Sequence, residues 1–418
     1  MPQGPGDGNL HITFLRMGTG DCTLITCPNG KRVMIDCGSD RYEEDELEED
    51  DDDKDDDDDD DTPPTNEEIQ RQKIHDAIFS KDFLDGGTHD LDLLILTHTD
   101  TDHRNKFNVF FNQKSQRGYR GIQPHIKKIY HSAVFRAYHP ASTLLGGIVN
   151  NDAHIKRVSF RKDAKGKPAG IKISPYPSDR PNLEQNALIL EDLPDGEEPD
   201  YENHEYVTEH RDLRILDGTV DGQAECYISI LASEVEEYLQ AALGTVFCNA
   251  DEPWTSSPAN SGSVVTLITF GDHKIIVCGD ATRHTEKYLY DRYLENQLIA
   301  NVTLVRVGHH GSFVTSSAQA FVTHISPQIA VVSSHKKETT HRVPSRVVLD
   351  RWKAQLEEED DHHLLYYWGK PPSKSDEDEI PISRVLTTAT DLYLSKTYKE
   401  GIWVTGSESD HITYDFPG

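Results

Sequence analysis

With 418 residues, 35% of them hydrophobic, the chain is long enough to bury a substantial core as one large or two ordinary domains. Its formal net charge is −31 at pH 7, its N-terminus lacks the regions of a signal peptide, and no apolar run is long enough to span a bilayer. The composition therefore excludes a membrane-spanning protein, and we expect a globular, cytoplasmic one.

The charge is unevenly distributed along the chain. Between positions 43 and 61, seventeen acidic residues stand against one lysine, so we interpret residues 43–64 as an acidic, disordered loop insertion. Between positions 104 and 172, fifteen lysines and arginines stand against two aspartates. Residues 107–209, which contain many Gly and Pro and show little periodicity, are therefore predicted to be a basic insertion in a single domain spanning residues 1–418.

The N-terminal part is predicted to contain three short strands, at 10–17, 22–27 and 31–38, the last two joined by an Asn-Gly turn typical of a hairpin. A helix is predicted at 66–84 because Ile69, Ile74, Ile78 and Phe83 recur with helical spacing, and a buried strand is predicted at 91–96. The later predicted elements are strands at 213–218 and 226–233, a hairpin at 263–280, a helix at 285–299, strands within 301–312 and 328–335, and a helix at 344–359. Strands alternate with helices, which indicates a layered α/β domain.

The six cysteines lie mostly within these apolar strand-like runs. They form no CxxC pair and no close framework of spacings. We therefore expect buried free thiols, as in a reducing compartment.

Four apolar strands end abruptly in side chains that can bind metal ions, in the stretches LLILTHTDTDH, KIIVCGD, TLVRVGHHGS and AVVSSHKKETTH. Strand ends in α/β folds can aim several side chains at one point, and buried unpaired carboxylates are costly. Taken singly, TDTD is typical of a solvated loop, HH of a surface pair, and Asp280 of a helix cap. Their joint occurrence in this order favours a site for two metal ions.

These stretches resemble the metallo-β-lactamase superfamily, whose pattern is HxHxDH followed by a later His, an Asp and a His. Asp100 replaces the second histidine, and the resulting HTDTDH is similar to the hydrolase domain of ComEC-type competence proteins and its stand-alone relatives. FLRMGTGDCTLITCPNGKRVMIDCGS, NSGSVVTLITFGDHKIIVCGDAT and VRVGHHGSFVTSS resemble further motifs of that group in the same order. The resemblance implies an α/β fold of the metallo-β-lactamase type, an αββα sandwich with insertions.

The resemblance also implies a set of metal ligands. His98 and Asp100 would bind one ion, Asp102 and His103 the other, and Asp280 would bridge both. Asp102 and Asp280 would thereby take part in catalysis. Because Asp100 makes the first site richer in oxygen, Mn²⁺ or Mg²⁺ is favoured somewhat over Zn²⁺.

The remaining ligand positions leave alternatives open. Either His309 or His310 would complete the second site. His131 is the candidate for the third-motif ligand, with a structural role as the alternative. His341 lies in a polar loop before a helix and is a candidate phosphate contact or proton donor.

The basic segment adjoins the metal motif and is interleaved with aromatic residues, which suits a polyanion such as DNA or RNA. The alternative is an insertion that only offsets the acidity of the rest. The candidate substrate-binding residues are Arg104, Lys127, Lys128, Arg161, Lys162 and Ser312.

The sequence therefore predicts a soluble phosphodiesterase with two divalent ions, a nuclease acting on DNA or RNA. One alternative is a hydrolase of a small phosphodiester, lactone or thioester, and another is a non-catalytic, metal-stabilised binding module. The acidic loop could compete with substrate for the basic segment or recruit a protein partner, or it could be a simple solvating insertion.

Overall fold

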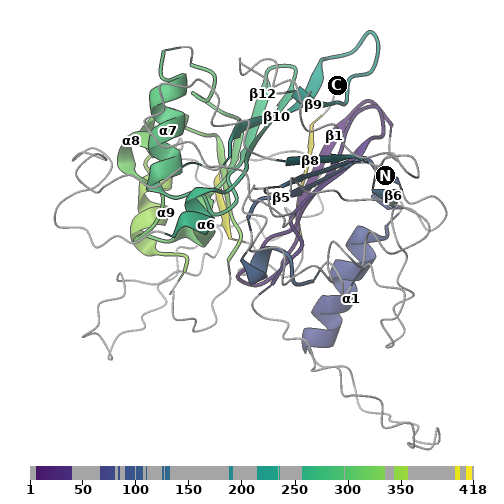
Figure 1. Cartoon of the computed structure of the whole chain (residues 1–418), viewed down its shortest axis with the longest axis horizontal. Coiled ribbons are helices and arrows are strands. Elements are labelled where there is room, and N and C mark those ends of the chain that lie inside the picture. Colours follow the sequence, from purple (N-terminus) through teal and green to yellow (C-terminus); the bar gives the residue numbers. More distant parts are fainter. Residues whose placement is uncertain are drawn as a thin grey trace, which may run out of the picture.

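Two mixed β-sheets, stacked face to face, form the centre of the molecule, which is described by a computed structural model (Figure 1). A separate two-stranded pair, β4 (Asp90–Leu91) with β6 (His125–Ile126), adjoins the first sheet at β3. The structure describes residues 6–39, 66–80, 83–84, 90–98, 100–106, 110, 125–126, 128–131, 188–191, 214–233, 235, 257–295, 297–334, 343–355, 401–404 and 411–416.

The first sheet combines the N-terminal strands with the C-terminal one. Its order is β16 (Ile412–Phe416), β1 (Leu10–Phe14), β2 (Thr23–Thr26), β3 (Arg32–Ile35), β5 (Leu93–Leu96), β7 (Lys128–His131) and β8 (Leu188–Glu191). Strands β3, β5 and β7 run parallel. The carboxyl ends of β3 and β5 therefore lie at the same edge, so the segments that follow them come together there.

The second sheet repeats this arrangement with later strands. Its order is β15 (Gly401–Val404), β14 (Ile329–Val332), β13 (Leu304–Arg306), β12 (His273–Val277), β11 (Val265–Phe270), β10 (Cys226–Ala232) and β9 (Arg214–Asp217). Strands β12, β13 and β14 run parallel, so the segments after them also share one edge.

Two hydrophobic cores hold these layers together. The first lies between the sheets and unites side chains such as Ile12 and Ile95 of the first sheet with Ile268 and Val331 of the second. The other packs the outer face of the second sheet against helices α7 (Arg283–Tyr293), α8 (Gln319–Ile325) and α9 (Arg346–Lys353). Both cores follow from strands that are apolar on both faces, as expected for inner layers.

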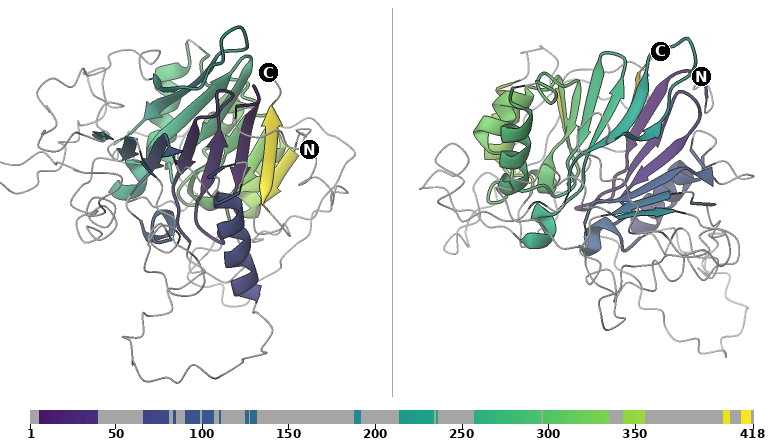
Figure 2. Two further views of the ribbon diagram at one scale, coloured as in Figure 1. Left: turned by 90° about the vertical axis from the view of Figure 1, so that its right-hand side faces the viewer. Right: turned by 45° about the horizontal axis from the view of Figure 1, so that its top comes forward.

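Helix α1 (Asn66–Ile78) covers the opposite side of the molecule, as the two views of Figure 2 also show. It buries Ile74 and Ile78 completely, and the Arg16 guanidinium donates to Gln70 at 3.0 Å. The layers are therefore helix, sheet, sheet and helix, which confirms the predicted αββα sandwich. Among the described residues, no helix is long and apolar enough to cross a bilayer.

The predicted helices are real but shorter. Helix α1 ends at Ile78, and Ile69, which we expected on its buried face, is 43% exposed. Helix α7 begins at Arg283 and ends at Tyr293. The chain then continues in turns, in which the carbonyls of Leu298 (3.2 Å) and Ala300 (2.7 Å) accept hydrogen bonds from Lys274 Nζ.

Other elements were not predicted from sequence. Helix α8 has seven residues, too few for a clear period, and its N-terminal amides are held by Glu286, which accepts from Ser317 N (2.5 Å) and Ala318 N (2.8 Å). Strands β7 and β8 lie within residues 107–209 and join the first sheet. The acidic loop at 43–64 and most of 107–209 lie outside the described residues.

The cysteine prediction is confirmed where it can be read. Among the described residues, five cysteines are free and buried: Cys22, Cys27, Cys37, Cys226 and Cys278. Each is enclosed by the strands or strand ends that its apolar neighbours predicted.

Candidate metal centre

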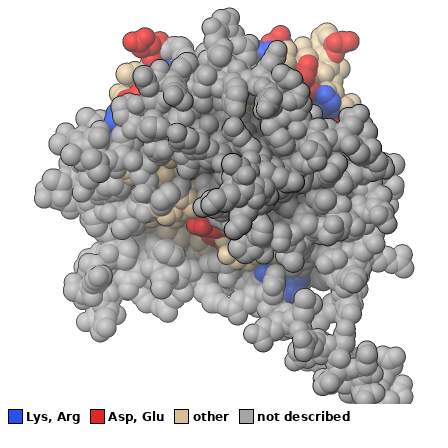
Figure 3. All heavy atoms as spheres, in the orientation of Figure 1, with Lys and Arg blue, Asp and Glu red and all other residues tan. Residues whose placement is uncertain are grey.

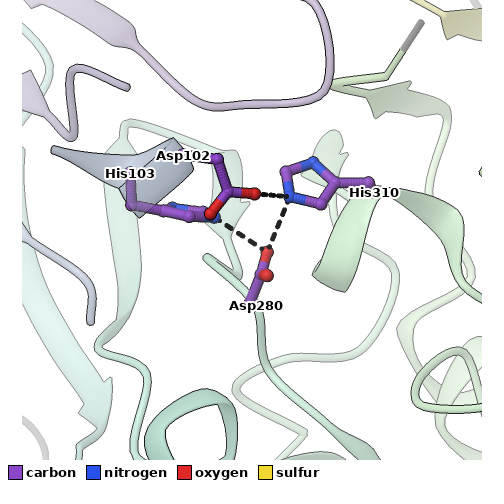
Figure 4. Close-up of side chains that lie close together, drawn as sticks. All are labelled: Asp102, His103, Asp280 and His310. Carbon is purple, nitrogen blue, oxygen red and sulfur yellow. Dashed lines mark hydrogen bonds and ion pairs between the residues drawn. The ribbon is translucent and has the colours of Figure 1, made fainter. Parts of the chain in front are cut away.

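Segments that follow three parallel strands converge between the sheets. The chain after β5 supplies the short 3-10 turn Thr101–His103, the chain after β12 supplies Asp280, and the chain after β13 supplies the turn Gly308–Gly311. Figure 4 shows Asp102, His103, Asp280 and His310 pointing toward one another, and their ligand atoms all lie within 4.8 Å. The predicted convergence is therefore observed for three of the four stretches, and the histidines of the fourth, AVVSSHKKETTH, lie outside the described residues.

The two oxygens of Asp280 divide this site. Oδ1 lies 3.2 Å from His103 Nε2 and 3.4 Å from His310 Nε2, and His310 Nε2 lies 3.2 Å from Asp102 Oδ2. We call Asp102, His103 and His310 the Oδ1 half. The side chains of His103 and His310 are 0% and 3% exposed, and that of Asp102 is 26% exposed, so solvent reaches this half at Asp102 alone.

The other oxygen faces a second group. Asp280 Oδ2 lies 3.7 Å from His98 Nε2 and 3.6 Å from His309 Nε2, and His98 Nε2 lies 3.6 Å from Asp100 Oδ2. We call His98, Asp100 and His309 the Oδ2 half. The side chain of His98 is fully buried, whereas those of Asp100 and His309 are 46% and 18% exposed, so this half opens to solvent mainly at Asp100.

Three of the histidines are held by hydrogen bonds at Nδ1. His103 donates to Asp36 Oδ2 at 2.7 Å and His310 donates to the Ser333 carbonyl at 2.7 Å. His98 Nδ1 lies 3.2 Å from Thr97 Oγ1, whose own hydrogen goes to Asp36. A proton fixed on Nδ1 leaves the Nε2 lone pair directed into the site, which is the arrangement of metal-binding imidazoles.

Several of the converging atoms have no hydrogen bond to the described part of the chain. These buried atoms are His98 Nε2, His103 Nε2 and Asp280 Oδ1, although His103 and Asp280 are close to each other. Such atoms are costly to bury unless something satisfies them. Imidazole nitrogens mixed with carboxylate oxygens suit Mn²⁺ or Zn²⁺, so the residues present fit divalent cations.

The electrostatics of the cluster point the same way. Burial lowers the pKa of His103, but Asp280, Asp36 and Asp102 outweigh it and raise that pKa well above its usual value; the pKa of His310 is raised in the same manner. Burial raises the pKa of Asp280, but the surrounding histidines hold it well below its usual range. The carboxylates therefore stay ionised, and the site attracts positive charge.

His309 behaves differently from its neighbours. Burial, which is only partly offset by Asp280, lowers the pKa of His309 to about 4. Both His309 and His310 have left-handed backbone angles, with φ of 46° and 53°. This conformation costs on the order of 1 kcal/mol or more for each non-glycine residue and is often found at functional sites.

A buried ion pair supports the cluster from behind and was missed in the sequence. The Arg306 guanidinium pairs with Asp21, donates to the Gly279 carbonyl and lies 3.9 Å from Asp280 Oδ1, while Asp21 Oδ2 lies 3.6 Å from His103 Nδ1. Arg306 is fully buried. Arg306 is the last residue of the apolar strand β13, and nothing in the spacing of that stretch indicates that the arginine belongs to a site.

Asp21 and Asp36 were visible only as parts of the MGTGD and MIDCG motifs. Asp36 Oδ1 accepts from Thr97 N at 2.7 Å, which ties the end of β3 to the end of β5. Gly38 then lets the next loop approach, because a Cβ there would lie 2.2 Å from the carbonyl group of Asp102. These contacts place the 100–106 segment against the first sheet.

The other predicted site residues have mixed outcomes. Arg104 is half-buried beside the metal motif, and Ser312 is buried, with its amide donating to the His309 carbonyl at 2.9 Å. His341, Lys127, Arg161 and Lys162 lie outside the described residues, as do the side chains of His131 and Lys128 in β7. Figure 3 shows the molecule in the orientation of Figure 1, and on this face both acidic and basic side chains appear along the upper edge of the described part.

Solved structures similar in fold to this chain include the following three. The metallo-beta-lactamase fold protein YhfI from Bacillus subtilis has a TM-score of 0.36 and 10% identity, over 84% of this chain and 95% of that one. The short form of human tRNase Z has a TM-score of 0.31 and 11% identity, over 77% and 91%. The long form of RNase Z from yeast has a TM-score of 0.33 and 11% identity, over 81% of this chain and 39% of that one.

No protein-family model and no curated protein matches this sequence. The narrower resemblance to ComEC-type hydrolase domains stays a prediction. The chemistry of this chain must therefore be inferred from its own residues.

Proposed function

We propose that this protein is a metal-dependent hydrolase of phosphodiesters, and more narrowly a nuclease. The observation that carries this proposal is the division of the site by Asp280, each of whose oxygens faces two histidines. A carboxylate shared in this way is suited to holding two cations close together. Divalent ions bound there would supply an activated water and positive charge at the attacked phosphorus.

The residues of the chain have separable roles in this proposal. His98, His103 and His310 offer Nε2 lone pairs that are aimed by hydrogen bonds at Nδ1. Asp102 and Asp280 stay ionised because the nearby imidazoles lower their pKa values despite burial, which by itself raises them. A cation that displaces the protons held by His103 and His310 would thus find the ligand atoms already directed into the site.

The Oδ2 half gives the direction of substrate approach. Asp100 is the most exposed member of either half, at 46%, compared with 26% for Asp102 and 18% for His309. A substrate that reaches the site from solvent would therefore meet Asp100 of the Oδ2 half first. The charge of residues 104–172 supports a nucleic acid as that substrate, because this basic segment follows the metal motif in the sequence and basic segments attract polyanions.

A cleavage assay tests the proposal. End-labelled single-stranded and duplex DNA and RNA, together with bis(p-nitrophenyl) phosphate, would be incubated with Mn²⁺, Mg²⁺ or Zn²⁺ and with the intact chain or Asp280→Ala. We expect cleavage that depends on metal and is abolished by the substitution. Hydrolysis of only the small diester would favour a small-molecule substrate, and metal binding without any hydrolysis would favour a binding module.

A further inference from the structure

The vicinal histidines His309 and His310 differ in how their rings are held. His310 donates from Nδ1 to the Ser333 carbonyl and directs Nε2 at Asp102 and Asp280. Beside His309 the nearest described partner is instead an amide, with Asn260 Nδ2 3.2 Å from Nε2 and 3.5 Å from Nδ1. Among the described residues, His309 therefore has no Nδ1 acceptor like those that orient the other three rings.

The orientation of the Asn260 amide is itself determined. Ser257 Oγ donates to Asn260 Oδ1 at 2.5 Å, so the nitrogen is the atom that faces the imidazole. Asn260 is 5% exposed and belongs to α6 (Pro258–Ser261), which contacts α7. Of its two contacts with the imidazole, the one to Nε2 is the shorter, so its N–H is placed to donate to the Nε2 lone pair of His309, the lone pair that a metal ion would need. A neutral imidazole held in this way carries its proton on Nδ1.

Exposure separates the two residues as well. The His309 side chain is 18% exposed, whereas His310 is 3% exposed. The backbone between them is fixed, since His309 N donates to the Gly279 carbonyl at 3.2 Å and Ser316 Oγ donates to the Gly308 carbonyl at 2.9 Å. The turn thus buries His310 between Asp102 and Asp280, whereas His309, which lies 3.6 Å from Asp280 Oδ2, stays partly exposed to solvent.

We propose that His309 contacts the substrate, donating a hydrogen bond from Nδ1 to a phosphate oxygen, and that His310 alone of the pair is a metal ligand. Asn260 is the positioning residue that occupies Nε2 of His309 and fixes its tautomer. This inference rests on the proposed function, because it assigns the bound group as a phosphodiester. It also separates two adjacent residues that their shared motif presents as equivalent.

The test compares metal binding with phosphate binding in the full chain. Variants would be His309→Gln, His310→Gln and Asn260→Ala, with His324→Gln on α8 as a matched control whose ring packs against Tyr290. Mn²⁺ stoichiometry and affinity would be measured by calorimetry, and inorganic phosphate would then be titrated into the Mn²⁺-loaded proteins.

We expect His309→Gln to keep the Mn²⁺ stoichiometry of the unmodified chain and to bind phosphate about ten- to a hundredfold more weakly, the scale of one hydrogen bond to a charged group. His310→Gln should lose metal. Asn260→Ala should weaken phosphate binding less, and adding it to His309→Gln should cause no further loss, because both act through one contact.

Loss of a metal equivalent in His309→Gln would overturn the inference, since it would make His309 a ligand. Unchanged phosphate affinity in that variant, or no phosphate binding by the unmodified chain, would overturn it too. If the unmodified chain cleaves no phosphodiester but His309→Gln still weakens phosphate binding, the proposed function fails and the phosphate contact stands.

Discussion

The two halves of the site share one carboxylate but are built differently. In the Oδ1 half, His103 and His310 are buried and are each anchored at Nδ1 by an acceptor 2.7 Å away. In the Oδ2 half, His98 is buried, but Asp100 is 46% exposed, and His309, 18% exposed, has no Nδ1 acceptor among the described residues. The comparison indicates that His103 and His310 are fixed by the fold before any ion binds, whereas Asp100 and His309 can adapt to an incoming substrate.

The largest expected effect comes from the residue behind both halves. Arg306→Met would leave Asp21 buried without its partner, so we expect the free energy of unfolding to fall by about 3–5 kcal/mol. Arg306→Lys should lose less because it keeps the charge but not the forked geometry. Urea unfolding of the metal-free proteins measures both changes. A loss below about 1 kcal/mol for the Met variant would show that this ion pair does not hold the site together.

Paired substitutions of the two motif aspartates test the comparison directly. Asp102→Asn should weaken Mn²⁺ binding about a hundredfold or more, since even changes to residues that only orient ligands cost up to that much. Asp100→Asn should cost about tenfold or less, because water can replace an exposed ligand oxygen. Calorimetric titration compares the two. Equal losses would contradict the distinction between the halves.

The anchor of the Oδ1 half gives the next effect. Asp36→Asn would place amide hydrogens where His103 and Thr97 now donate, so Mn²⁺ affinity should fall about ten- to a hundredfold. Asn260→Ala changes the surroundings of His309 in the Oδ2 half. It should leave the Mn²⁺ affinity within about twofold of that of the unmodified chain, because no hydrogen bond that orients a ligand is lost. If Asn260→Ala proved as harmful, both halves would depend on equally specific anchors.

The pH dependence of metal binding should also distinguish the halves. The pKa values of His103 and His310 are raised above 6.5, so both imidazoles hold protons that a cation must displace. Apparent Mn²⁺ affinity should therefore fall as pH decreases below those raised values, by about tenfold per pH unit for each proton released. His309, with a pKa of about 4, should contribute no such competition near neutral pH. An ordinary His has a pKa of about 6.5. An apparent Mn²⁺ affinity that stayed constant between about pH 6 and 8 would therefore contradict the raised pKa values of His103 and His310.

The smallest expected effect concerns His11, which belongs to neither half and serves as a control. His11 bridges Asp415 (2.5 Å) and Asp7 (3.1 Å); burial lowers its pKa, but these two carboxylates outweigh burial and raise it. The resulting stabilisation is present below pH 6.5 and is lost as pH rises through the folded-state pKa. His11→Gln should remove on the order of 0.5 kcal/mol of stability below pH 6.5, measured by urea unfolding, and leave Mn²⁺ affinity unchanged. A change in that affinity would mean that β1 and β16 influence the site.

Local patterns in the sequence were sufficient for much of the fold. Strands β2, β3, β11 and β12 are short apolar runs bounded by turn residues, and such runs need no distant information to be recognised. Helix ends were less predictable. Helix α7 ends before the carbonyls of Leu298 and Ala300, which accept hydrogen bonds from Lys274 of strand β12. The sequence pattern of the helix does not indicate that contact.

The sequence by itself determined which ligand-type residues follow which strands, because apolar runs and the residues that end them are local features. Only the tertiary structure decided how those residues pair: which oxygen of Asp280 each histidine faces, that Arg306 neutralises Asp21, and that Asn260 occupies the lone pair of His309. These partners are distant in sequence, and their meeting depends on the stacking of two sheets. Side-chain periodicity encodes which face a residue occupies, but it does not encode what lies across from that face.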